Sequence, residues 1–147
     1  MSKAKRRCGK CGHREVSDHA ASGRLATYRH MRLEIPAGIK IPTCGNCGAR
    51  WFDEATAAVL DNALEPIYGQ TLRERLESDL RVMLGKGVTE ARVEKALGVS
   101  RGYLSRLRSG RRVPSRELVV AVAYMAKDKA DPPLAETIFP GDRRAAG

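Results

Sequence analysis

The chain has 147 residues, enough for one ordinary domain or two small ones, and its 27 Lys+Arg against 17 Asp+Glu give a formal net charge of +10. So strong a positive charge favours a polyanionic partner. No run of about 18 apolar residues is present, and no hydrophobic stretch follows the basic N-terminus, so we expect neither a membrane span nor a secretory signal. We therefore expect a cytoplasmic protein, in which four cysteines are more typical of metal ligands than of disulfides.

The charge is distributed unevenly along the chain. Residues 1–50 carry a net charge of +8, residues 51–70 carry −4, and residues 71–147 carry +6. The acidic segment coincides with a change of residue pattern, so we interpret it as the join between two modules. We predict a cysteine-containing module with a short C-terminal helix over 1–66, a helical domain over 70–139, and a disordered tail over 140–147.

Two copies of the pattern C-G-x-C-G occur, at residues 8–12 and 44–48. Two residues between paired cysteines allow a tight turn to bring both sulfurs to one ion. We therefore predict a closed tetrahedral site for one structural Zn²⁺, with the ligands Cys8, Cys11, Cys44 and Cys47. A rubredoxin-like iron site uses the same four ligands, and the spacing does not choose between the metals. No pattern makes a ligand of any histidine (His13, His19 and His30).

The 32 residues between the cysteine pairs exceed the usual ribbon spacing of about 15–20, which requires an inserted hairpin or loop. Residues 12–24 are polar and bounded by glycine, so we expect them to be mobile. We predict one hairpin in which a strand at 28–36 turns at Ala37-Gly38 into a strand at 39–42. Trp51-Phe52 is expected to pack into the core beside the metal site.

Helix signals follow from residue 53 onward. Asp53 caps a predicted helix that reaches Leu64 and ends at Pro66 and Gly69. The capping box Thr71-Leu72-Arg73-Glu74 begins another, which Gly85-Lys86-Gly87 ends.

Three more predicted helices have Thr89, Ser100 and Ser115 as N-terminal caps, with Gly98 making the turn between the first two. Residues 134–139 are expected to form a short last helix. We therefore predict a mainly α protein with a small β zinc module, its C-terminal domain built from five helices.

The segment from Leu97 to Ser115 reads as the turn and recognition helix of a helix-turn-helix, followed by a basic loop. Six arginines and no acidic residue lie between positions 100 and 116. The stretches VTEARVEKALGVS (88–100), YLSRL (103–107) and SGRRVPS (109–115) resemble the Xre/phage-repressor family of DNA-binding domains over roughly residues 70–128. The resemblance implies a third helix lying in the major groove and a homodimer on a palindromic operator.

Two positions depart from the pattern of that family. Glu90 stands where the family usually has a glutamine that braces a phosphate, and an acid does not do so. Glu94 stands where a small residue is usual, because two helices pack closely there. We expect Glu94 either to point outward or to pair with an arginine.

The resemblance implies DNA contacts for the residues around the recognition helix. Arg101 and Arg106 are expected to read bases, since arginine donates a bidentate pair to guanine. Gly102, which has no side chain, is expected to let the helix lie deep in the groove. Alternatively, Tyr103 contacts a thymine methyl or a phosphate. Phosphate contacts are expected from Thr89, Ser105, Arg108, Arg111 and Arg112, and Ser100, at the helix start, is counted among the DNA-binding residues.

The whole layout, a cysteine pair, a hairpin, a second cysteine pair, a helix and an Xre-type domain, resembles the zinc-finger antitoxins of bacterial toxin–antitoxin operons. That resemblance implies a zinc module able to bind a partner toxin. Two functions therefore stay open: a sequence-specific repressor, autoregulatory or not, or an antitoxin or adaptor whose zinc module mainly binds protein. We do not expect an enzyme, because the sequence shows no carboxylate pair, Ser/His/Asp arrangement or phosphate-binding glycine loop.

Overall fold

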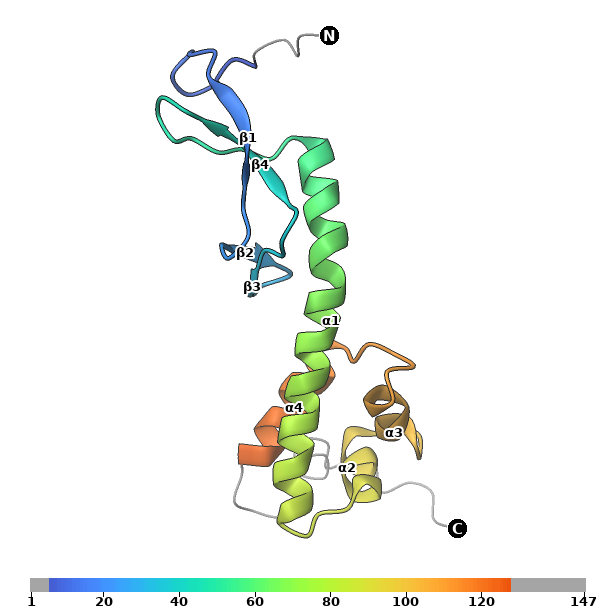
Figure 1. Ribbon diagram of the computed structural model, residues 1–147. Helices are drawn as coiled ribbons and strands as arrows, with labels where there is room; N and C mark the ends of the chain where they lie inside the picture. Colours follow the sequence, from blue (N-terminus) through green and yellow to red (C-terminus); the bar gives the residue numbers. More distant parts are fainter. Residues whose placement is uncertain (1–5, 128–147) are drawn as a thin grey trace. The chain divides into compact units, whose positions relative to one another are not determined.

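A computed structural model describes residues 6–127 of the chain (Figure 1). The predicted helix at 134–139 and tail at 140–147 lie outside these residues. The chain forms two compact units, Met1–Tyr68 and Gly69–Gly147, called here the first and second unit. The helix α1 (Glu54–Gly85) begins in the first unit and ends in the second.

The first unit contains two separate antiparallel pairs of strands. Strand β1 (Val16–Ala20) pairs with β4 (Lys40–Cys44), and β2 (Leu25–Tyr28) pairs with β3 (Met31–Glu34). The predicted mobility of residues 12–24 is wrong, because β1 lies within them.

The predicted single hairpin is also wrong, because β3 pairs back with β2 across a turn at Arg29-His30. Both turn residues have positive φ (44° and 70°), which a two-residue hairpin turn between twisted strands requires. The pairing puts Ala26 opposite Leu33 and Tyr28 opposite Met31 on one face of the hairpin. The expected turn at Ala37-Gly38 is present, but the strands that it connects, β3 and β4, do not pair with each other.

Helix α1 corrects a third prediction, since it continues through Pro66 and Gly69 rather than ending there. The capping box at Thr71 therefore lies inside a helix. Interior proline and glycine cost a helix about 3 and 1 kcal/mol respectively. Buried apolar side chains recur along α1 at four-residue steps and each contributes about 1.5–3 kcal/mol, which outweighs that cost: Leu60, Leu64, Tyr68, Leu72, Leu76 and Leu80.

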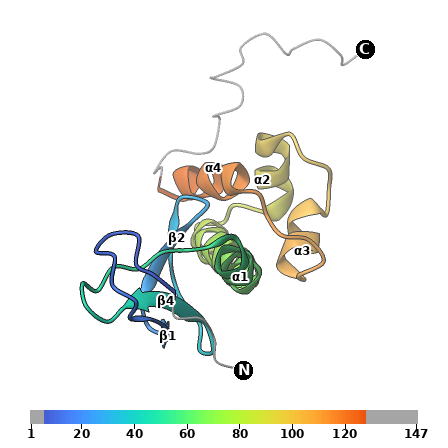
Figure 2. The same cartoon turned by 90° about the horizontal axis from the view of Figure 1, so that it is seen from above.

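The second unit arranges α2 (Glu90–Leu97), α3 (Tyr103–Arg108) and α4 (Arg116–Lys127) around the second half of α1 (Figure 2). Its core is aliphatic and drawn from all four helices: Leu72, Leu76, Leu80, Met83, Val93, Leu104, Leu107, Val119, Val122 and Met125. Residues 6–127 thus contain four helices, and none of these is long and apolar enough to cross a membrane. The predicted count of five helices in the C-terminal domain includes the one at 134–139, which lies outside the described residues.

Candidate functional site

The antiparallel register of β1 and β4 brings the two cysteine pairs together. Val16, at the start of β1, lies opposite Cys44, at the end of β4. The first pair precedes β1 and the second begins at the end of β4, so both occupy the same end of the two-stranded ladder. All four sulfurs lie within 4.8 Å of one another.

The sulfur positions fit one tetrahedral metal ion. The Sγ atoms of Cys8 and Cys47 are 3.7 Å apart, and those of Cys11 and Cys44 are 3.6 Å apart. Metal–sulfur bonds of about 2.3 Å in a tetrahedron require sulfur separations of roughly 3.8 Å. The four predicted ligands are therefore placed where they can hold a metal ion, and no histidine belongs to the cluster within the described residues.

The two cysteine turns have the same backbone structure. In the first, Cys8 N–H donates to His13 O at 2.8 Å and Gly12 N–H donates to Cys8 O at 2.9 Å. The second turn repeats both bonds at the same sequence offsets and distances. Gly12 and Gly48 have φ of 75° and 67°, a conformation that favours glycine and ends each turn.

Backbone N–H groups and the closeness of the four sulfurs shift the pKa values of the cysteine thiols. The N–H of His13 lowers the pKa of Cys11 to about 6, and the side-chain amide of Asn46 donates to the same sulfur at 3.7 Å. The N–H of Ala49 lowers the pKa of Cys47, but loss of solvent and the three neighbouring sulfurs outweigh it, so that pKa rises to about 11. Four sulfurs this close require a cation between them if all are to be thiolates.

The aromatic pair beside the metal-ligand cluster does not form a core. Trp51 is half-buried, and Phe52 has 52% of its surface exposed. The buried apolar side chains of the first unit lie mainly between Leu33 and Ile41 and on the first half of α1, so the predicted core packing of Phe52 is wrong.

In the second unit, the turn between α2 and α3 follows the sequence signals. The Thr89 hydroxyl accepts the N–H of Arg92, which caps α2. Gly98 has φ of 66°, and its N–H donates to carbonyls of the last turn of α2. Both predicted boundaries of α2 are confirmed.

Glu94 organises the start of α3. Its side chain is buried, with 3% exposed, and its carboxylate accepts the N–H of Gly102 at 3.0 Å and that of Leu104 at 2.9 Å. These donors are among the N–H groups that a helix start leaves without intrahelical partners. Glu94 therefore neither points outward nor pairs with an arginine: it caps the following helix, and the predicted cap Ser100 does not. The Ser100 hydroxyl instead accepts from Arg106 at 3.1 Å.

Helix α3 presents a polar outer surface. Leu104 and Leu107 are fully buried, whereas Ser105 and Arg106 are exposed. The Arg106 guanidinium also lies 6.0 Å from the centre of the half-buried Tyr103 ring. Its Ser100 bond and this ring hold the Arg106 side chain over the helix start.

Arg101 and Gly102 lie in the turn before α3, not within the helix as the sequence suggested, because α3 begins at Tyr103. Arg101 is exposed, and Gly102 has φ of 77°. A side chain at position 102 would meet Arg106 Nη1 at 3.5 Å. The glycine thus suits both the backbone conformation and the nearby arginine.

Arg108 is exposed, but its guanidinium is bound by two carboxylates of the second unit. Its guanidinium donates to both oxygens of Glu77, at 2.6 and 3.0 Å, and also to Glu90. The hydrogen bond to Glu77 raises the pKa of Arg108 and lowers that of Glu77. These bonds form an ion-pair network that joins α1, α2 and α3.

One face of α1 supports the loop that follows α3. A Cβ at Gly69 would lie 3.4 Å from both methyls of Val113, and one at Gly110 would lie 3.9 Å from Arg73 Cζ. The α1 residues in these contacts are Gly69, Arg73 and Glu77, the last of which binds Arg108. They follow one another at steps of four residues along α1. The loop thus carries Arg111 and Arg112, both exposed, on a fixed support.

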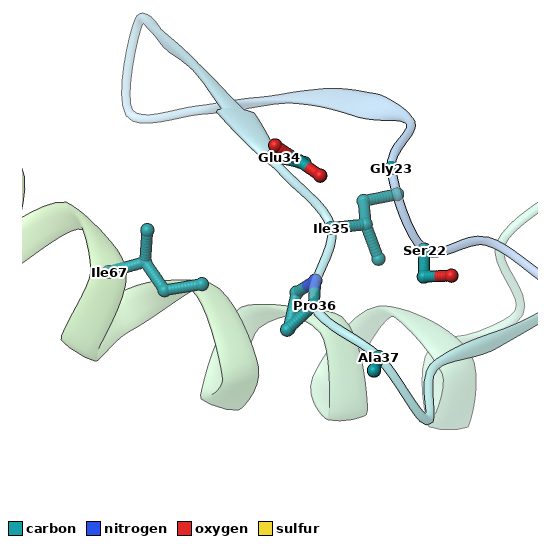
Figure 3. A pocket seen from close by; sticks show the side chains of 7 residues that line it. All are labelled: Ser22, Gly23, Glu34, Ile35, Pro36, Ala37 and Ile67. Carbon is teal, nitrogen blue, oxygen red and sulfur yellow. The ribbon is translucent and has the colours of Figure 1, made fainter.

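A shallow hollow of about 520 Å³ lies in the first unit, between the segment after β3 and α1 (Figure 3). Its lining combines apolar side chains with one carboxylate: Ser22, Gly23, Glu34, Ile35, Pro36, Ala37 and Ile67. It contains none of the predicted functional residues.

Residues 67–125 match the family model of a helix-turn-helix domain. Over this range the chain is therefore similar to a helix-turn-helix domain. The matched range covers α2, the turn at Gly98 and α3, the three parts described above, and this class of domain binds DNA with its second helix. No curated protein matched the chain.

Two participants in the helix-turn-helix were not found from the sequence. Glu94 was noticed only as an exception, although an acid ten residues before a buried leucine of the next helix can reach that helix's start. The supporting face of α1 had one signal, a glycine at position 69 inside an otherwise helical pattern, which indicates close packing.

Proposed function

We propose that this protein is a sequence-specific regulator of transcription, a repressor of the Xre type that binds a palindromic operator as a homodimer. The observation that carries the proposal is the presentation of α3. Glu94 fixes its start, two leucines anchor its inner side, and Arg101, Arg106, Arg111 and Arg112 are exposed in and around it. Occupying an operator would exclude polymerase from the same DNA.

Base reading is assigned to the start of α3. Six residues of helix span about 9 Å, which fits within the width of a major groove. Arg101 and Arg106 are the exposed arginines at this end, and each has the geometry to donate two hydrogen bonds to guanine. Tyr103, partly covered by Arg106, is assigned to a thymine methyl or a neighbouring phosphate.

Phosphate contacts are assigned to the residues flanking α3. Thr89 and Ser105 are exposed hydroxyls, and Arg111 and Arg112 belong to the loop supported by α1. Arg108 is left out because Glu77 and Glu90 already hold its guanidinium. Such contacts set position on the duplex and are independent of base sequence.

The test compares single arginine variants on selected operator and on random DNA. Arg101→Ala and Arg106→Ala should each cost about 1–3 kcal/mol on operator and relax base preference at one position per half-site. Arg111→Ala should weaken both DNAs similarly and flatten the salt dependence. Arg81→Ala, an exposed α1 arginine outside the set, is the control for net charge. Equal loss on both DNAs for all three variants would refute the base-reading assignment.

We further propose that the four-cysteine cluster holds one structural Zn²⁺, which stabilises the first unit. When bound, the ion supplies a crosslink among four ligands and neutralises their charge. The residues themselves provide the two glycine-ended turns and the N–H groups that lower the pKa of Cys8 and Cys11.

A second candidate function, antitoxin or adaptor, is favoured by the hollow in the first unit. Its apolar wall of Ile35, Pro36 and Ile67 beside the Glu34 carboxylate suits a side chain of a partner protein that is apolar with a basic end. The partner to test is the product of the adjoining gene. Ala37→Trp should abolish its co-purification, whereas Ala58→Trp, at an exposed α1 position outside the hollow, should not.

A further inference from the structure

Helix α4 has an exposed seam on the side opposite its core face. Val120 and Tyr124 are 58% and 61% exposed, unusually high for large apolar side chains. Glu117 and Lys127 are also exposed and lie at the two ends of the same line. The four residues of the seam therefore follow one another at steps of three, four and three residues. At 3.6 residues per turn these four side chains fall within roughly 80° of arc. Val119, Val122 and Ala126 are buried on the other side.

The order of residues along the seam is self-complementary in one orientation only. The acid stands at the N-terminal end, the base stands at the C-terminal end, and the two apolar residues lie between them. In an antiparallel pair of α4 helices centred on position 122, Glu117 faces Lys127 of the other copy and Val120 faces Tyr124. A parallel pair would put Glu117 against Glu117 and Lys127 against Lys127.

We propose that this seam is the contact with a second copy of the chain, formed by two α4 helices packed antiparallel about a two-fold axis. A two-fold interface uses the same patch on both copies, so every favourable pair occurs twice. The inference rests on the dimer of the proposed function and adds its interface.

The seam is also small. Stable dimers usually bury about 800 Å² per partner, more than one face of a twelve-residue helix provides. We therefore infer weak self-association in the absence of DNA, which an operator with two half-sites strengthens by holding the copies together.

The experiment measures self-association of the full chain without DNA by sedimentation equilibrium, over a wide range of protein concentration and at low salt. Glu117→Lys and Lys127→Glu should each weaken the dimer about tenfold, since one reversal converts two attractive pairs into two repulsive ones. The double variant Glu117→Lys/Lys127→Glu should recover most of the loss. Val120→Glu should abolish association, whereas Val59→Glu, at a similarly exposed α1 position in the first unit, should leave it unchanged.

Three results would overturn the proposal. The first is a wild-type chain that stays monomeric at every concentration. The second is a double variant no better than the single variants, which would contradict the antiparallel pairing. The third is a Val120→Glu variant that still associates like wild type but has lowered thermal stability, because the seam would then cover another part of its own chain. Since no DNA is present, none of these results depends on whether the protein binds an operator.

Discussion

Replacing Glu94 by alanine tests whether this carboxylate positions the recognition helix. The change removes the acceptor of two N–H groups, those of Gly102 and Leu104, while the aliphatic core around them stays. A buried donor left without a partner costs about 1–3 kcal/mol. The N–H of Gly102 lies nearer the surface and can bond to water, which recovers part of the cost of its lost hydrogen bond. We therefore expect a total destabilisation of roughly 2–4 kcal/mol.

Two optical signals separate the effect on the two units. Far-UV circular dichroism during urea unfolding follows the helices, whereas fluorescence of the single tryptophan, Trp51, follows the first unit. With a slope of about 1–3 kcal/mol per molar urea, the helix transition should move by roughly 1–3 M, and the Trp51 transition should move less. Glu94→Gln keeps one acceptor oxygen and should lose about half as much stability.

Glu74→Ala, at an exposed position of α1, is the matched control and should stay within about 0.5 kcal/mol of wild type. Amide hydrogen exchange at Leu104 gives an independent local measurement and should accelerate in Glu94→Ala. If Glu94→Ala unfolds at the wild-type urea concentration with unchanged exchange at Leu104, the capping role is refuted.

Two more predictions concern the metal cluster and the ion pairs. Cys44→Ser should lose the one equivalent of zinc that purified wild-type protein is expected to contain, with the Trp51 signal altered and the helix signal kept; equal zinc in both proteins, or none in either, would contradict the four-cysteine site. Glu77→Gln should be less stable than wild type near neutral pH. The hydrogen bond from Arg108 holds the pKa of folded Glu77 below its usual 4.5, so its stabilisation is complete above that pH and is lost as the pH falls through the folded pKa. The gap between the two proteins should therefore close in acid, and a gap independent of pH would refute the pairing.

Local signals in the sequence predicted several helix starts and one turn correctly. The caps at Asp53, Thr89 and Ser115 and the turn at Gly98 lie where expected, because each depends on one side chain and the backbone within three or four residues of it. The cysteine cluster was predicted equally well, because the repeated spacing of the cysteines determines the turns that bring their sulfurs together.

The errors came from interactions between distant residues. Strand pairing in the first unit depends on which faces share a core, and Arg29 is not a residue usual at positive φ. Pro66 and Gly69 looked like a helix end because the energy of continuing α1 comes from burial, which local propensity does not include. Glu94 and Arg108 changed role for a similar reason. The sequence does not show that each charged side chain already has a hydrogen-bond partner ten to thirty residues away.

The central claim is that α3 reads a specific DNA sequence, and selection of bound sequences from random duplex DNA tests it most directly. The full chain should enrich one palindromic motif, and Arg101→Ala should enrich the same motif with one position per half-site relaxed. Failure of the wild-type chain to enrich any motif, while it still binds random DNA, would contradict sequence-specific recognition by this helix.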